Sequence, residues 1–117
     1  MGGGYIEYPS SLDDKFNVAI IDGLDRYLCA KQLKDIIDFK DKDGFMIILD
    51  NSDWYRNTSR YIRDTLDLIE FDFHGFGPIN AYTFTTSIFV SRNFNFKPID
   101  DIQPHFSLQA IHHYENV

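Results

Sequence analysis

Residues 16–23 read FNVAIIDG, and this stretch decides the fold. A mainly apolar run that stops at an Asp-Gly pair is typical of a strand buried on both faces of an α/β sheet. Residues 45–49, FMIIL, repeat the pattern and are followed by the polar segment DNSD at 50–53. The two runs therefore predict two strands that lie side by side in a parallel sheet.

The segment between these runs predicts a helix that covers the sheet. Over residues 25–39 the apolar side chains recur at intervals of three and four positions, which places them on one helical face. A second helix is predicted at residues 58–68. Its inward side is expected to consist of Tyr61, Ile62, Thr65 and Leu66. Each parallel strand is thus followed by a helix, as right-handed crossovers require.

Two further strands are predicted at residues 68–73 and 84–90. Between them, HGFGP at 74–78 predicts a loop, because two glycines and a proline do not continue the hydrogen bonding of either strand. No helix fits in this connection, so the two strands are expected to be antiparallel. The predicted fold class is α/β, with about four strands, namely two parallel ones plus an antiparallel terminal pair, and with covering helices.

The composition indicates a single folded domain. The chain has 117 residues, of which 44% are hydrophobic and 25% charged, enough to build a core within a soluble surface. Residues 1–15 are interpreted as a lead-in, either a cloning remnant or an internal start. The folded body is expected at 16–92, and an irregular extension at 93–117.

The net charge and the lack of long apolar stretches limit the classes of partner that we expect for this protein. Lys and Arg number 11 against 18 Asp and Glu, and the net charge of -7 disfavours binding to nucleic acid. No apolar stretch reaches the ~20 residues of a membrane span, and no secretory signal is present, so we expect a cytoplasmic protein without a membrane partner. Cys29 is the single cysteine, which excludes an internal disulfide.

Three segments resemble a bacterial family of class I, S-adenosylmethionine-dependent methyltransferases: IIDGLDR at 20–26, GFMIILDNSDWY at 44–55 and GFGPINAYTFTTSIF at 75–89. The chain is similar to the C-terminal half of that Rossmann-like domain, strands four to seven of its sheet. The resemblance implies a methyl donor held by a glycine-rich turn and an acidic strand tip in the other half. Neither element precedes residue 16, so no residue is assigned to cofactor binding, and S-adenosylmethionine is not expected to bind this chain alone.

The resemblance also gives a role to acidic residues at two strand tips. Because the carboxyl ends of parallel strands face one crevice, Asp22 and the pair Asp50-Asn51 are expected to converge. Their oxygens suit Mg²⁺ or Ca²⁺, and similarity to metal-dependent O-methyltransferases makes Asp22, Asp50 and Asn51 the candidate metal ligands. Capping of the following helices by the same side chains is the alternative interpretation.

A candidate base and a candidate substrate pocket complete the expected site. Related enzymes often place a His or Lys as general base where this chain has Asp25, which makes Asp25 the candidate catalytic residue, although an Asp is the weaker base. Helix capping is again the alternative for Asp25. Rings near the strand tips are candidates for substrate binding, with loop packing as the alternative. These are Trp54, Tyr55, Phe76 and Tyr82.

Two classes of function stay open. The first is methyl transfer to a hydroxyl of a small molecule or sugar, as part of a complete enzyme, with the isolated chain inactive. The second is a non-catalytic remnant or interaction module. In both cases the strand at 16–21 would lie at an edge of the sheet, and exposed apolar edges seek partners. We therefore expect a homo-oligomer, or pairing with a separate chain that carries the cofactor half.

Overall fold

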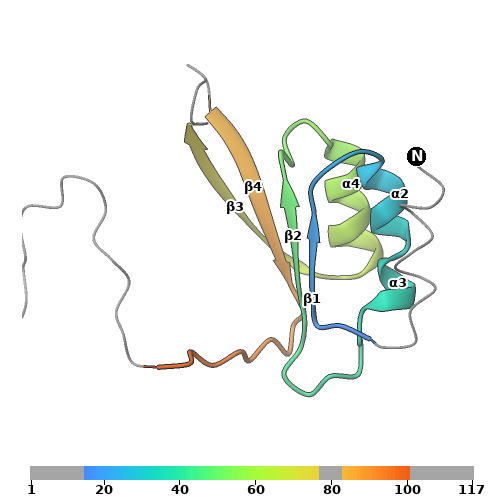
Figure 1. The fold of residues 1–117 in the computed structure, drawn as a ribbon, viewed down its shortest axis with the longest axis vertical. Coiled ribbons are helices and arrows are strands. Elements are labelled where there is room, and N and C mark those ends of the chain that lie inside the picture. The colour runs from blue at the N-terminus through green and yellow to red at the C-terminus, as the bar shows by residue number, and fades with distance from the viewer. Residues whose placement is uncertain (1–14, 77–82, 101–117) are drawn as a thin grey trace, which may run out of the picture.

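The computed structural model describes residues 15–76 and 83–100, which form a four-stranded sheet with helices on one side (Figure 1). The strands are β1 (Val18–Ile21), β2 (Met46–Asp50), β3 (Ile69–Phe76) and β4 (Thr83–Val90). Their order in the sheet is β1-β2-β4-β3, so the last strand lies between two earlier ones. β1 and β2 are parallel, and β4 is antiparallel to both of its neighbours. The predicted parallel pair and the antiparallel terminal pair are both confirmed.

The helices are shorter and more broken than the sequence predicts. The predicted helix at 25–39 is divided into α2 (Arg26–Lys31) and α3 (Leu33–Ile36). It ends early because the N–H of Asp38 donates to the carbonyl of Phe16 and the N–H of Phe16 donates to the carbonyl of Ile36, both at 2.8 Å. These bonds hold Ile37 in an extended conformation beside Phe16. Tertiary hydrogen bonding therefore overrides the helical periodicity at this point.

The second helix begins at α4 (Arg56–Arg60) and continues as the π-helical turn η1 (Tyr61–Thr65). It ends near Asp67, whose φ of 55° is the left-handed conformation that often stops a helix. Ile62 is buried, and Tyr61 and Leu66 pack against the core, as predicted. Thr65 is exposed, so its predicted inward position is wrong. The wider π turn, closed by the Leu68 N–H to the Arg63 carbonyl at 2.9 Å, rotates the last residues away from α-helical spacing.

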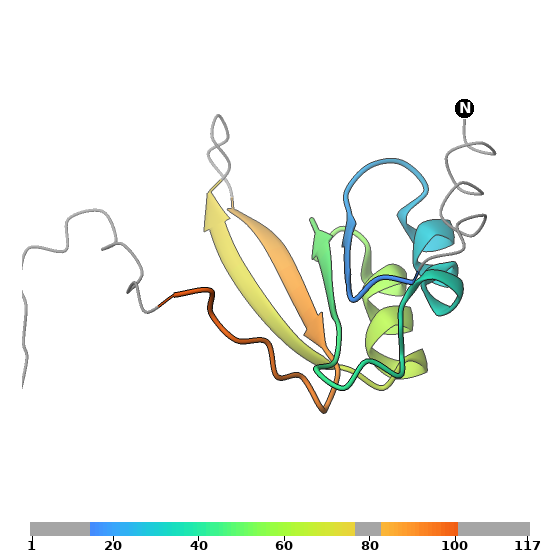
Figure 2. The same cartoon turned by 60° about the horizontal axis from the view of Figure 1, so that its bottom comes forward.

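The core lies between the helices and one face of the sheet (Figure 2). Alternate residues of the strands point to this face, and the helices contribute their apolar sides. The buried residues are Ile21, Ala30, Leu33, Ile37, Phe45, Ile47, Leu49, Ile62, Leu68 and Phe89. Among the described residues, no helix has the length and apolar character needed to cross a bilayer.

The opposite face of the sheet carries exposed apolar side chains, and at β1 this corrects the prediction that the strand at 16–21 is buried on both faces. Ile20 of β1 is 69% exposed and Phe73 of β3 is 56% exposed. The described helices cover only the other face, so every second residue of a strand is left toward solvent. β1 lies at one edge of the described sheet, as expected.

The hairpin formed by β3 and β4 is longer than predicted. His74, Gly75 and Phe76 belong to β3 and pair with Thr85, Phe84 and Thr83, so the expectation of a loop beginning at His74 is wrong. A glycine adopts extended backbone readily, and the ladder continues through it. Gly77 and Pro78, the rest of the expected loop, lie outside the described residues.

Residues 91–100 form no helix or strand. The N–H of Asn95 donates to the carbonyl of Asp43 at 2.8 Å, which holds this segment against the turn before β2.

Candidate functional site

Arg26 joins two of the predicted site residues at the carboxyl ends of β1 and β2. Its Nη2 donates to Asp22 Oδ1 at 3.0 Å and to Asn51 Oδ1 at 3.2 Å. Asp22 follows β1, and Asn51 follows β2 with a φ of 55°. The parallel pairing of the two strands brings these tips together, as the sequence predicts.

Asp50 makes its contacts elsewhere. Its Oδ1 accepts a hydrogen bond from Thr86 Oγ1 at 2.8 Å and another from the backbone N–H of Asn51 at 3.0 Å. Asp50 is the last residue of β2, and Thr86 lies opposite it on β4. Among the described hydrogen bonds, none links Asp50 to Asp22 or Arg26. The tip cluster therefore consists of Asp22, Arg26 and Asn51.

Arg26 is buried, and sequence reasoning did not identify it. Only 8% of its surface is exposed, and its guanidinium carbon lies 4.2 Å from the centre of the Tyr55 ring. A buried guanidinium needs such compensation, because an unpaired buried charge is costly. The available signal was the spacing of Asp22 and Arg26, four positions apart in the IDGLDR segment.

The tip cluster does not fit a divalent metal ion in this arrangement. Arg26 already supplies a positive charge to the oxygens of Asp22 and Asn51. A second cation beside it would be repelled. Within residues 15–76 and 83–100, no three His, Cys, Asp or Glu side chains are grouped to hold a metal. The metal-ligand roles of Asp22, Asp50 and Asn51 stay predictions.

Asp25 occupies the N-cap position of α2 in a left-handed conformation, with a φ of 57°. Its side chain makes no capping hydrogen bond, so the geometry gives no support to the capping interpretation. Asp25 is exposed and close enough to Cys29 to act on it. Burial raises the pKa of the Cys29 thiol, and the negative charge of Asp25 raises it further, so this cysteine is a poor nucleophile.

The predicted substrate-binding rings do not form one pocket. Trp54 and Tyr55 line an open hollow of about 750 Å³ over α2 and α4, together with Tyr27. Phe76 lies at the end of β3, is 73% exposed and does not line that hollow. Tyr82 lies outside the described residues. Tyr55 contacts the tip cluster through Arg26.

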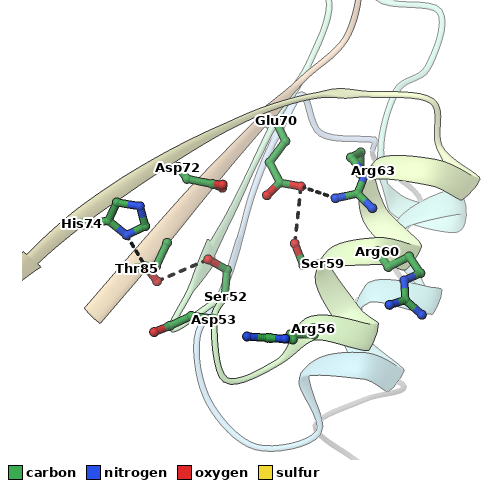
Figure 3. A pocket seen from close by; sticks show the side chains of 10 residues that line it. All are labelled: Ser52, Asp53, Arg56, Ser59, Arg60, Arg63, Glu70, Asp72, His74 and Thr85. Carbon is green, nitrogen blue, oxygen red and sulfur yellow. Dashed lines mark hydrogen bonds and ion pairs between the residues drawn. The ribbon is translucent and has the colours of Figure 1, made fainter. Parts of the chain in front are cut away.

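A second polar cluster lies between β3 and the helix formed by α4 and η1 (Figure 3). Asp72 on β3 faces Ser87 on β4, and Ser87 Oγ donates to Asp72 Oδ1 at 2.6 Å. Ser87 is fully buried, and its Oγ also lies 2.6 Å from Ser52 Oγ. His74 Nδ1 lies 2.7 Å from Thr85 Oγ1. Sequence reasoning did not find this cluster, although Glu70, Asp72 and His74 alternate along one strand.

The two carboxyl groups of this cluster are perturbed in opposite directions. Burial raises the pKa of Glu70, and the neighbouring Asp72 raises it further, against the lowering effect of Arg63. Hydrogen bonds from Glu70 and from Ser87 lower the pKa of Asp72. Asp72 is therefore the stronger acid of the pair and keeps its negative charge to lower pH.

Comparisons with protein-family models, with curated proteins and with solved structures find no match. The similarity to methyltransferases therefore rests on the three sequence segments.

Proposed function

We propose that this α/β unit is part of a class I, S-adenosylmethionine-dependent methyltransferase domain that transfers a methyl group to a hydroxyl of a small molecule or sugar. The observation that carries the proposal is the pairing of β1 and β2, which are parallel neighbours and end in Asp22 and in Asp50-Asn51. The antiparallel pair of β3 and β4 at the other edge is what the C-terminal end of such a Rossmann-like sheet requires.

The residues of the tip cluster act by positioning rather than by chemistry. Arg26 fixes Asp22 and Asn51 relative to each other and supports the Tyr55 ring. A rigid polar edge next to an aromatic hollow is suited to orient a hydroxylated acceptor. We assign no step to a metal ion, because Arg26 occupies the space between two of the expected ligands.

Asp25 is the proposed base. It is exposed at the N-cap of α2, three residues after Asp22 in the chain. The bound donor supplies an electrophilic methyl group on a sulfonium. With such a donor in place, the Asp25 carboxylate would accept the proton of the acceptor hydroxyl as its oxygen takes the methyl group from the sulfur.

The test is a methyl-transfer assay on the full-length gene product that contains this chain (the extended protein), using labelled S-adenosylmethionine and a panel of sugars and phenols. We expect transfer to at least one hydroxyl acceptor, and a rate at least ~100-fold lower in Asp25→Asn, the usual contribution of a general base. Asp53→Asn is the matched control, because Asp53 is an exposed acid outside the tip cluster. Absence of transfer from the extended protein would overturn the proposal.

An interaction module is the second candidate, and the exposed apolar face of the sheet favours it. Val18 and Ile20 of β1 are 43% and 69% exposed at one edge of the sheet, and Phe71 and Phe73 are exposed on the same face of β3, at the opposite edge. Exposed apolar side chains next to an open strand are typical of a protein interface. This candidate predicts association without methyl transfer.

A further inference from the structure

The cavity between β3 and the α4–η1 helix has two walls of opposite charge. Its volume is about 280 Å³, and it shares no lining residue with the tip cluster of Asp22, Arg26 and Asn51. Arginines line the helical wall, and carboxylates line the strand wall (Figure 3). Ser52, Ser59 and Thr85 supply hydroxyl groups between them.

The helical wall carries arginines that form no ion pair within the described part of the chain. Arg56, Arg60 and Arg63 are spaced by four and then three positions, which places them along one side of the helix. Arg63 is occupied, because its guanidinium pairs with Asp64 at 2.8 Å and with Glu70 at 3.2 Å. Among the ion pairs of the described residues, none involves Arg56 or Arg60. Figure 3 shows Arg56 directed toward Asp53 and the strands, and Arg60 turned outward.

The strand wall holds one carboxylate in a fixed position. The charge of Glu70 is compensated by Arg63, and Ser59 Oγ donates to the same Glu70 oxygen at 3.4 Å. Asp72 forms no ion pair within the described part of the chain, but Glu70 shares a hydrogen bond with it, and Ser87, itself fully buried, fixes its Oδ1 at 2.6 Å. The lining charges without an ion pair in the described part of the chain are thus Arg56 and Arg60 on the helical wall, and Asp53 and Asp72 opposite them; Arg60 turns outward, which leaves Arg56 as the guanidinium directed into the cavity.

We propose that this cavity binds a small zwitterion of the amino-acid class, with its carboxylate on Arg56 and its ammonium group on Asp72. A guanidinium offers paired donors that match a carboxylate, and a carboxylate accepts the N–H groups of an ammonium. A simple anion bound to Arg56 would be repelled by the negative charge of Asp72, and a simple cation bound to Asp72 would be repelled by the positive charge of Arg56. A volume at the low end of ligand cavities fits a molecule of this size. The inference does not depend on the proposed methyl transfer.

The test compares zwitterions with their separated halves by calorimetric titration of the full chain. The probes are glycine, β-alanine and 4-aminobutanoate, whose charges lie at increasing separation, against acetate and methylammonium. We expect at least one zwitterion to bind at millimolar concentration and both single-charge probes to bind at least tenfold more weakly. Equal binding of acetate would overturn the proposal, and so would the absence of binding by every zwitterion.

Three variants locate the site. Arg56→Gln and Asp72→Asn are each expected to weaken zwitterion binding at least tenfold. Arg92→Gln is the matched control, because Arg92 is an exposed arginine that pairs with Asp67 away from the cavity. Asp72→Asn removes a partner of buried Ser87, so its folding is checked by circular dichroism. Arg56 is exposed, so Arg56→Gln is expected to fold. It therefore tests the site even if Asp72→Asn unfolds. Unchanged affinity in Arg56→Gln would contradict the assignment.

Discussion

At the scale of single residues, Arg26 is the side chain that holds together the polar residues after β1 and β2. It is buried, pairs with Asp22 and Asn51, and stacks on Tyr55. Asp22 remains 61% exposed, so solvent screens the ion pair and reduces its contribution. The hydrogen bond to Asn51 and the ring contact are less screened. Arg26 is therefore structural first and contributes to any site through the residues it positions.

Replacement of Arg26 tests this role. Arg26→Gln is expected to lower the free energy of unfolding by about 1–2 kcal/mol, because it removes a cation–π contact and charged hydrogen bonds. Arg26→Lys is expected to be nearly as harmful, since an ammonium lacks the planar fork. Urea denaturation provides the measurement, with Arg92→Gln as the exposed control. A midpoint for Arg26→Gln equal to that of the parent chain would refute the assignment.

Arg26 also shows what the sequence leaves open at this scale. The meeting of Asp22 with Asn51 was predictable, because both follow parallel strands that end at the same edge. The identity of the group between them was not predictable from strand-tip chemistry, which favours a metal ion. Only the positions of the side chains show that an arginine from the next helix fills the gap. The separation of Asp50 from this cluster depends in the same way on its contact with Thr86.

Gly44 has a backbone conformation and a close environment that favour glycine. Its φ is +84°, and an added Cβ would overlap Ser91 Oγ and lie 2.8 Å from Phe94 Cα. Gly44→Ala is expected to destabilise the fold by more than about 1 kcal/mol in thermal or urea unfolding. Gly75→Ala is the control, because a Cβ added at Gly75 would meet no atom within 4 Å. Equal stability of the two variants would contradict this account.

Glu70 gives the fold a dependence on pH. Its folded-state pKa is raised above the ordinary value of 4.5, chiefly by burial, so its favourable contribution is complete below that value and is lost as pH rises through the folded pKa. Glu70→Gln removes this titration. The stability of Glu70→Gln relative to the parent chain is therefore expected to increase from acidic to neutral pH. Urea denaturation over a pH series measures it, and a relative stability that stays constant or falls would disprove the explanation.

At the scale of elements, the sequence predicts strands better than helices. Each of the four strands was expected within a few residues of its observed position, because apolar runs bounded by polar tips are a strong signal. The first helix stops at Ile36 because the backbone of Phe16 takes up the next hydrogen bonds, a long-range contact that no local periodicity reveals. The π turn at Tyr61–Thr65 likewise depends on how the chain reaches β3.

The edge strand β1 is expected to drive association. Ile20 points away from the core and is 69% exposed, so Ile20→Lys places a charge on the edge without disturbing the helix side. Size-exclusion chromatography with light scattering is expected to show a dimer or larger species at micromolar concentration, and a monomer for Ile20→Lys. Leu24→Lys, at an exposed position outside the sheet, is the control. A monomeric parent chain would contradict this prediction.

At the scale of the whole molecule, the described residues cover one face of the sheet and leave the other open. The described helices and the buried core occupy one side, whereas the apolar side chains of β1 and β3 remain exposed on the other. A second layer on that face would complete an α/β architecture with helices on both sides. The proposed methyltransferase domain requires such a layer, together with a donor-binding turn. The same requirement explains why the chain alone is not expected to hold S-adenosylmethionine.

Calorimetric titration with S-adenosylmethionine tests the central claim most directly, performed on the isolated chain and on the full-length gene product that contains it (the extended protein). The account predicts no binding by the isolated chain and stoichiometric binding by the extended protein. Failure of the extended protein to bind, or equal binding by the isolated chain, would contradict it.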